Sequence, residues 1–140
     1  MSGDADSVEQ ALNSGDIHEL LRVWEDFNRG ETWRETSAIG SDQARVSAAQ
    51  FLTEVREVAA LEALRANAQA VELLTARRWY VIKSARESGA TWSQIGEALG
   101  ITKQAAHDFY RGRIEEKEKY LPDLHDVAAA RAVLEEAGEE

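Results

Sequence analysis

The sequence predicts an all-α protein in three parts: an N-terminal helical region over residues 1–72, a three-helix unit over 73–114, and a helical extension with a C-terminal helix over 115–140. Two features of the composition favour helices. Alanine, the strongest helix former, occurs 23 times, and proline occurs once, at Pro122. Hydrophobic residues make up 44% and charged residues 30% of the chain, which is typical of a folded globular domain. Apolar residues also recur at helical spacing.

The first helices are predicted from caps and breakers. A short helix over residues 7–13 is expected to stop before Gly15. Asp16 can accept hydrogen bonds from free backbone N–H groups, so it is expected to cap a second helix. Arg29-Gly30 is expected to end that helix, and the polar residues 31–41 are expected to form a loop.

The next helical stretch has no breaker before residue 88. Ser41 or Asp42 is expected to begin it. A single straight helix of that length would measure about 70 Å, which is too long for a compact domain, so we expect a break near residues 60–66. The apolar stripe shifts to another side of the helix there. Its second part has the spacing of a coiled-coil seam, and we expect it to lie in a core or a dimer interface: Leu61, Leu64, Ala68 and Val71.

The three-helix unit is predicted to contain helices over residues 73–88, 93–99 and 103–110. Gly89 and Gly100 follow the first two helices, where glycine favours the left-handed backbone that turns the chain. Thr91 and Gln94 have the spacing of a capping box. Gly96 is expected where a second helix approaches too closely for a side chain. The residues expected to build this unit are Thr91, Gln94, Ile95, Gly96, Leu99, Gly100, Ile101, Ala106 and Phe109, with Ala105 also facing inward.

A solvated helical extension is expected after residue 110, ended by Leu121-Pro122. Asp123 is expected to cap a last helix that runs to about residue 136, before a short tail.

The order of helix, glycine turn and helix resembles the helix-turn-helix of bacterial DNA-binding regulators, both the Cro/repressor-like and the sigma-factor region-4-like kinds. The string is similar to one found in small actinobacterial proteins of this class. The resemblance covers about residues 74–113. It is carried by Gly89-Ala90-Thr91, Ile95-Gly96 and Ala98-Leu99-Gly100-Ile101-Thr102-Lys103-Gln104-Ala105-Ala106.

The resemblance implies that the helix after Thr102 is a recognition helix that enters the major groove of double-stranded DNA. Its outward residues would face the bases: Thr102, Lys103, Gln104, His107, Asp108 and Arg111. Asp108 is an acid on that face and requires either a cytosine amino group or a neighbouring arginine. Flanking phosphates would be neutralised by Arg77, Arg78, Lys83, Arg86 and Arg113.

The distribution of charge supports a DNA-binding segment inside an acidic protein. The formal net charge is −10. Residues 77–113 nevertheless carry a net charge of +4, and the rest of the chain carries −14. Because one small DNA-binding module buries little surface, we expect a homodimer that reads two half-sites.

Other classes of protein are either excluded or kept as alternatives. No apolar run approaches 18 residues, so no membrane partner is expected. The chain has no cysteine, no phosphate-binding loop and no metal-ligand spacing among His18, His107 and His125, so we expect no metal, no cofactor and no enzyme. The expected location is cytoplasmic. One alternative is an adaptor or antitoxin-like protein whose acidic N-terminal helices bind a partner, and another is a phage or plasmid protein that marks a DNA site.

Overall fold

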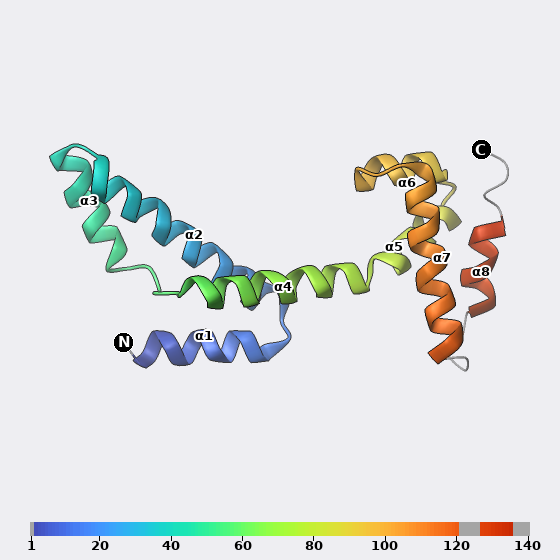
Figure 1. The fold of residues 1–140 in the computed structure, drawn as a ribbon, viewed down its shortest axis with the longest axis horizontal. Helices are drawn as coiled ribbons and strands as arrows, with labels where there is room; N and C mark the ends of the chain where they lie inside the picture. Colours follow the sequence, from blue (N-terminus) through green and yellow to red (C-terminus); the bar gives the residue numbers. More distant parts are fainter. Residues whose placement is uncertain (1, 121–126, 136–140) are drawn as a thin grey trace. The chain divides into compact units, whose positions relative to one another are not determined.

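A computed structural model describes residues 2–120 and 127–135, and all of its regular structure is helical (Figure 1). The chain divides into two compact units, Met1–Leu74 and Thr75–Glu140. The boundary predicted from the sequence lies between residues 72 and 73. Each unit has its own hydrophobic core and is described separately. No helix in the described ranges is both long and apolar enough to cross a bilayer.

Unit 1 contains α1 (Ser2–Ser14), α2 (Ile17–Ile39), α3 (Asp42–Leu52) and most of α4 (Ala60–Ala76). The prediction of a helix over residues 7–13 was too short, because α1 begins at Ser2. The carboxylate of Asp4 accepts a hydrogen bond from the Glu57 backbone N–H at 3.2 Å, which fastens the first turn of α1 to the segment before α4.

The cap predicted at Asp16 is confirmed, since its carboxylate accepts from the backbone N–H groups of His18 and Glu19. The predicted end of α2 near Gly30 and the predicted loop over residues 31–41 are wrong. The helix continues to Ile39, and Gly30 is buried within it.

Contacts made by its last turns explain why α2 passes through Gly30. Trp33 stacks on Phe51 of α3 with ring centroids 4.5 Å apart, so the end of α2 gains a packing partner. Such a contact offsets the cost of about 1 kcal/mol for a glycine inside a helix. Gly40 then ends α2, and Ser41 caps α3 by accepting from the Ala44 N–H, as predicted for Ser41.

The predicted break in the following stretch exists but lies earlier than residues 60–66, over residues 53–59. Arg56 fixes this segment. Its guanidinium donates to the Asp26 carboxylate at 2.9 Å and to the Ser7 hydroxyl at 3.2 Å, which ties the segment to α2 and α1. The core of unit 1 comprises Val8, Ala11, Leu12, Leu20, Val23, Val58, Ala63, Ala66 and Ala70.

Unit 2 begins with the end of α4 and contains α5 (Arg78–Glu87), α6 (Trp92–Leu99), α7 (Lys103–Tyr120) and α8 (Val127–Glu135). The helix predicted over residues 73–88 is therefore divided at Arg77, and the helix predicted to end at residue 110 continues to Tyr120. The core surrounds the fully buried Trp92 and Tyr110, together with Ile82, Ile95, Ala106, Ile114, Ala130 and Val133.

Helix α8 belongs to this core, although the sequence grouped it with a separate extension. The hydroxyl of Tyr110 donates to the Ala130 carbonyl at 2.7 Å in the interior, and Arg131 forms a two-pronged ion pair with Glu118 of α7. The hydrogen bond from Arg131 lowers the pKa of the Glu118 carboxyl. The predicted cap at Asp123 and the residues His125 and Asp126 lie outside the described ranges.

Candidate nucleic-acid interface

The turn between α6 and α7 is built by local backbone interactions. Thr91 accepts from the Gln94 N–H and Gln94 accepts from the Thr91 N–H, so the predicted capping box is present. At the other end of α6, Gly100 is left-handed with φ 71°. The Ile101 N–H bonds back to the Gly96 carbonyl at 2.9 Å, which closes the helix and directs the chain into α7.

Gly96 is required by the close approach of this turn. A Cβ atom on Gly96 would lie 2.8 Å from the Ile101 carbonyl oxygen and 3.0 Å from the Lys103 nitrogen. Both atoms belong to the backbone, which cannot move aside as a flexible side chain can. The close approach predicted from the sequence is present, and it is made by the turn itself and the first residue of α7.

Side chains predicted to face inward do not all do so. Ala106 is fully buried, as predicted, and Phe109 is partly buried against the core. Ile101 is 42% exposed and Ala105 is exposed, so the expectation that both pack inward is wrong. The left-handed Gly100 directs Ile101 outward, and Ala105 lies beside Ala106 on the outer side of the helix.

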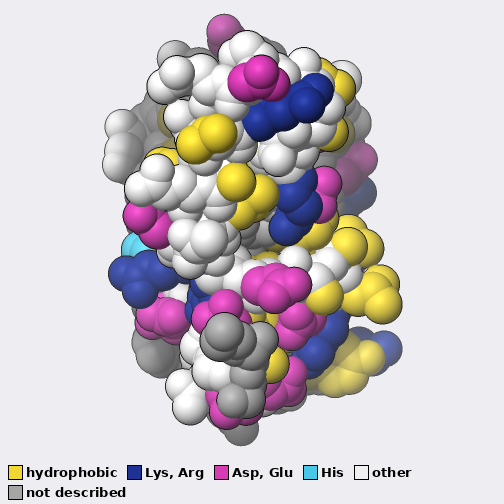
Figure 2. Space-filling model, turned by 90° about the vertical axis from the view of Figure 1, so that its left-hand side faces the viewer, with side chains coloured by type: hydrophobic (Ala, Val, Ile, Leu, Met, Phe, Trp, Pro, Cys, Tyr) yellow, Lys and Arg dark blue, Asp and Glu magenta, His cyan; other side chains and the backbone are white. Residues whose placement is uncertain are grey.

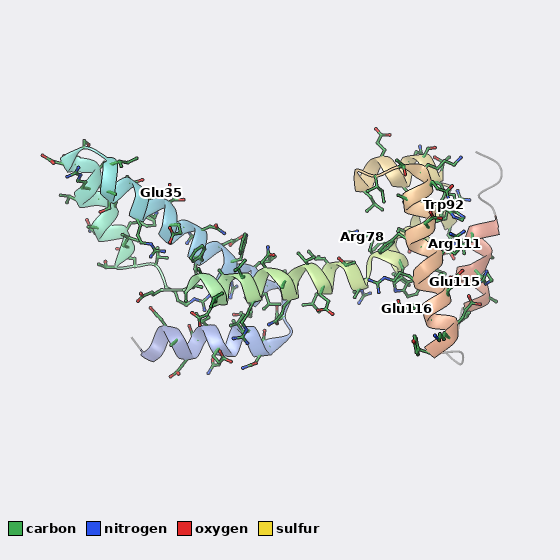
Figure 3. The ribbon with its side chains drawn as sticks, viewed as in Figure 1. Glu35, Arg78, Trp92, Arg111, Glu115 and Glu116 are labelled. Carbon is green, nitrogen blue, oxygen red and sulfur yellow. The ribbon has the colours of Figure 1, made fainter. Side chains whose placement is uncertain are left out.

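The exposed face of α7 carries most of the residues predicted to read bases. Thr102 caps the helix by accepting from the Ala105 N–H at 3.0 Å. Helical spacing of three to four residues then places one row of exposed side chains along α7, and Figure 3 labels the last two of them: Gln104, Asp108, Arg111 and Glu115. Lys103 is also exposed, at the first position of the helix.

Asp108 joins the polar side chains of this face. Gln104 and Arg111 both donate to its Oδ1 atom, each at 2.9 Å. The acid therefore has the neighbouring arginine that the sequence required. Asp108 holds both groups on the exposed face, and its negative charge opposes the approach of a polyanion.

His107 does not belong to this exposed face, which corrects the prediction that it points outward. Its ring packs edge-on against Trp92 with centroids 5.0 Å apart, and its side chain is 22% exposed. The reason is helical geometry, because His107 lies three residues before the fully buried Tyr110 and so faces nearly the same side of α7.

The predicted phosphate-binding residues divide into exposed and structural groups. Arg86 is only 9% exposed, donates to the Ala90 carbonyl at 2.9 Å and stacks over Trp92. Its guanidinium binds the backbone just after α5, so Arg86 has a structural role and not the predicted contact with a phosphate. Arg86 lies four residues after buried Ile82, and this helical spacing could have predicted that Arg86 faces the core. The Lys83 side chain is 14% exposed and pairs with Glu87 at 2.6 Å, so it also has a local role.

Three other arginines remain accessible around one side of the unit. Arg77 is exposed and lies over the Tyr80 ring, and Figure 3 labels Arg78 in α5. Arg78 and Arg113 both stack on Phe109, with guanidinium carbons 5.5 Å and 5.6 Å from the ring centroid. The sequence assigned Phe109 a packing role only. In the structure its ring also makes cation–π contacts with two guanidinium groups.

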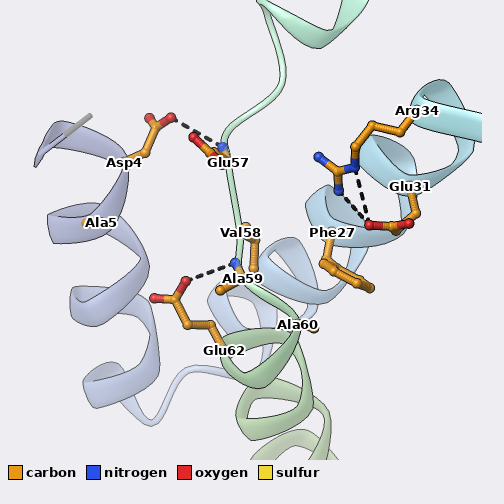
Figure 4. A pocket seen from close by; sticks show the side chains of 10 residues that line it. All are labelled: Asp4, Ala5, Phe27, Glu31, Arg34, Glu57, Val58, Ala59, Ala60 and Glu62. Atoms are coloured by element: carbon orange, nitrogen blue, oxygen red, sulfur yellow. Dashed lines mark hydrogen bonds and ion pairs between the residues drawn. The ribbon is translucent and has the colours of Figure 1, made fainter. Parts of the chain in front are cut away.

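Unit 1 contains a cleft, but its side chains are used for local contacts. The cleft has a volume of about 370 Å³ and is lined by four carboxylates, and Figure 4 shows how they are used. Asp4 and Glu62 accept from backbone N–H groups, while Glu31 pairs with Arg34. The Asp4 contact joins α1 to the segment before α4, the Glu62 contact closes the start of α4, and the Glu31–Arg34 pair lies within α2. The described residues contain no group of three metal-ligating side chains.

The face of the molecule drawn in Figure 2 mixes acidic, basic and hydrophobic side chains. No protein-family model, no curated protein and no solved structure matches the chain.

Proposed function

We propose that the protein is a sequence-specific double-stranded DNA-binding protein, a transcriptional regulator of the cytoplasm that reads the major groove with α7. The observation that carries the proposal is the pair α6 and α7, joined through left-handed Gly100, with an exposed polar row on the second helix. The N-terminus of α7 is exposed, so its free backbone N–H groups can bind a phosphate beside Thr102.

The exposed side chains of α7 have the donors and acceptors that base edges require. Gln104 can pair with N6 and N7 of adenine, and Arg111 or Lys103 can pair with O6 and N7 of guanine. Asp108 competes for both Gln104 and Arg111, so DNA must displace at least one of these hydrogen bonds. We therefore expect modest affinity and little non-specific binding.

Phosphate contacts come from the accessible arginines beside this helix. The candidates are Arg77, Arg78 and Arg113. Arg86 and Lys83 are not among them, because both make local contacts. Stacking on Phe109 restricts the freedom of Arg78 and Arg113 before DNA arrives, which lowers the entropy that binding must remove. Each phosphate neutralised contributes a slope of about −0.9 to the dependence of log affinity on log salt.

Selection from random duplex DNA at about 50 mM salt tests this function. The wild type is expected to enrich a site, and Lys103→Glu with Arg111→Glu is expected to enrich none. Arg22→Glu with Arg34→Glu is the matched control, because it makes the same charge change in exposed residues of α2 that also form ion pairs at i,i+3 spacing.

The control is expected to enrich the same site as the wild type. A palindromic site would also support the homodimer. If no protein enriches a site, the proposal fails, and the adaptor or antitoxin-like reading becomes the better account. Loss of enrichment in both double variants would likewise contradict a specific role for α7.

A further inference from the structure

Helix α4 has two apolar sides, and only one of them is used inside unit 1. Ala63, Ala66 and Ala70 are buried in the core. The larger side chains of Leu61, Leu64 and Val71 are 74%, 57% and 54% exposed. The sequence predicted that these residues lie in a core or a dimer interface. In the structure, α4 contributes its alanines, and not these larger residues, to the core of unit 1.

The exposed residues form a continuous seam, which we define as Leu61, Leu64, Ala68 and Val71. Their spacing of three, four and three residues repeats every seven positions, as in helices that pair through knobs-into-holes packing. An isolated exposed leucine needs no explanation, but a row of this length on one helix indicates a partner. All four residues belong to unit 1.

The charges beside the seam are complementary to a second copy of the same helix. Arg65 and Glu72 are seven residues apart, so they lie on the same edge of the seam, and both are exposed. In an antiparallel pair, a two-fold axis between residues 68 and 69 places Arg65 opposite Glu72 of the second copy, and the reciprocal pair forms too. A parallel pair would instead place Arg65 near uncharged Ala60 and Asn67.

We infer that the protein forms a homodimer in which the α4 seams of two copies pack antiparallel. Within one copy Arg65 lies 3.7 Å from Glu9 and its side chain is 52% exposed, so it can reach across to the second copy. The inference does not depend on DNA binding and is tested without DNA.

Sedimentation equilibrium tests the seam. At micromolar concentration the wild type is expected at twice the chain mass of 15.5 kDa, and Leu64→Glu with Val71→Glu is expected at the monomer mass. Ile39→Glu with Val46→Glu is the control, because both residues are exposed and apolar but lie on α2 and α3. A monomeric wild type overturns the inference, as does a dimer that the seam variant leaves intact.

The register is tested by introduced cysteines, since the chain has none of its own. Ala68→Cys lies beside the two-fold axis and is expected to form an intermolecular disulfide under mild oxidation. Leu61→Cys is expected to form none, because the two copies of residue 61 would be about 22 Å apart along the antiparallel helices. Cross-linking through both positions would indicate a parallel pair and overturn the antiparallel arrangement.

Charge exchange gives an independent readout. Arg65→Glu and Glu72→Arg are each expected to weaken the dimer, and the double variant is expected to restore it. Failure of the double variant to recover the dimer would overturn the predicted contact between Arg65 and Glu72. If the seam variant unfolds more easily than the wild type at a concentration where both are monomers, the chain itself covers the seam and the inference is wrong.

Discussion

Gly96 is the residue on which the turn between α6 and α7 depends most directly. Glycine is required at this position by lack of space and not by an unusual backbone conformation. A Cβ atom there would meet three backbone atoms at 2.8 to 3.0 Å. The sequence predicted the close approach of a second helix here, and the approach is made by the turn and by the first residue of α7. The burial of Arg86 and His107 was missed, because charge and polarity suggested exposure where helical spacing indicated the core side.

Gly96→Ala is expected to destabilise unit 2 by about 1 to 3 kcal/mol, the usual cost of overpacking. Gly112→Ala is the control, because Gly112 also lies inside a helix and has open space around it. That substitution is expected to stabilise α7 by up to about 1 kcal/mol. Urea denaturation of the two variants measures both effects, and equal effects would show that the approach of the turn does not restrict Gly96.

The buried hydroxyl of Tyr110 is expected to make the stability of unit 2 depend on pH in the alkaline range. Burial, with a smaller contribution from the charge of Glu87, raises the pKa of the Tyr110 hydroxyl from 10.0 to about 12. Because the folded pKa is the higher one, this contribution to stability is fully present below pH 10 and is lost as the pH rises through about 12. The phenolate absorbance of the wild type should therefore include a late step near pH 12 that Tyr110→Phe lacks. Absence of that difference would contradict the burial of the Tyr110 hydroxyl.

At the scale of elements, the sequence predicted the helix starts better than the helix ends. Asp16, Ser41 and Thr91 cap helices through their own side chains, so local residues suffice to identify them. The course of α2 past Gly30 depends on the stacking of Trp33 on Phe51, which lies in the next helix. Packing of that kind between distant positions cannot be predicted from local propensity alone.

If α7 binds DNA as proposed, Asp108 would weaken that binding, through its negative charge and through its hydrogen bonds to Gln104 and Arg111. Asp108→Ala removes a negative charge and releases Gln104 and Arg111, so the affinity for mixed-sequence duplex DNA is expected to rise several-fold. The slope of log affinity against log salt is expected to steepen by about one unit if Arg111 gains a phosphate. Fluorescence anisotropy at several salt concentrations measures both quantities.

Asp42→Ala is the control for Asp108→Ala, because it makes the same charge change at an exposed acid of unit 1. It is expected to change affinity little. An unchanged affinity in Asp108→Ala, or an equal gain in the control, would show that Asp108 does not restrain the face of α7.

The whole molecule consists of two units with separate cores, and this predicts separate responses to core substitutions. Leu20→Ala empties a fully buried site in unit 1 and is expected to cost about 2 to 5 kcal/mol there. Amide hydrogen exchange should quicken in α1 and α2 while α6 and α7 keep their protection. Ile114→Ala is expected to have the opposite pattern, and a loss of protection throughout the chain in either variant would contradict two independent cores.

The all-α fold could be predicted because composition and helical periodicity are properties of the whole chain. The role of α8 could not, since its attachment to α7 through Tyr110 and Arg131 depends on residues 20 and 13 positions away in sequence. Most of the residues predicted to face the bases are exposed together on α7, but His107 is not among them. Arg86, predicted to contact a phosphate, is buried.

The most direct test of the DNA-binding proposal is a map of amide chemical shifts while a duplex is added. We predict that the perturbed amides cluster at residues 102–105, 108, 111 and 112, on the exposed face of α7, and that the shifts diminish as salt is raised from about 50 to about 200 mM. The same titration of the Lys103→Glu, Arg111→Glu variant should move none of them. Shifts confined to unit 1, or an unperturbed α7 at the lowest salt, would contradict the proposal that this helix reads DNA.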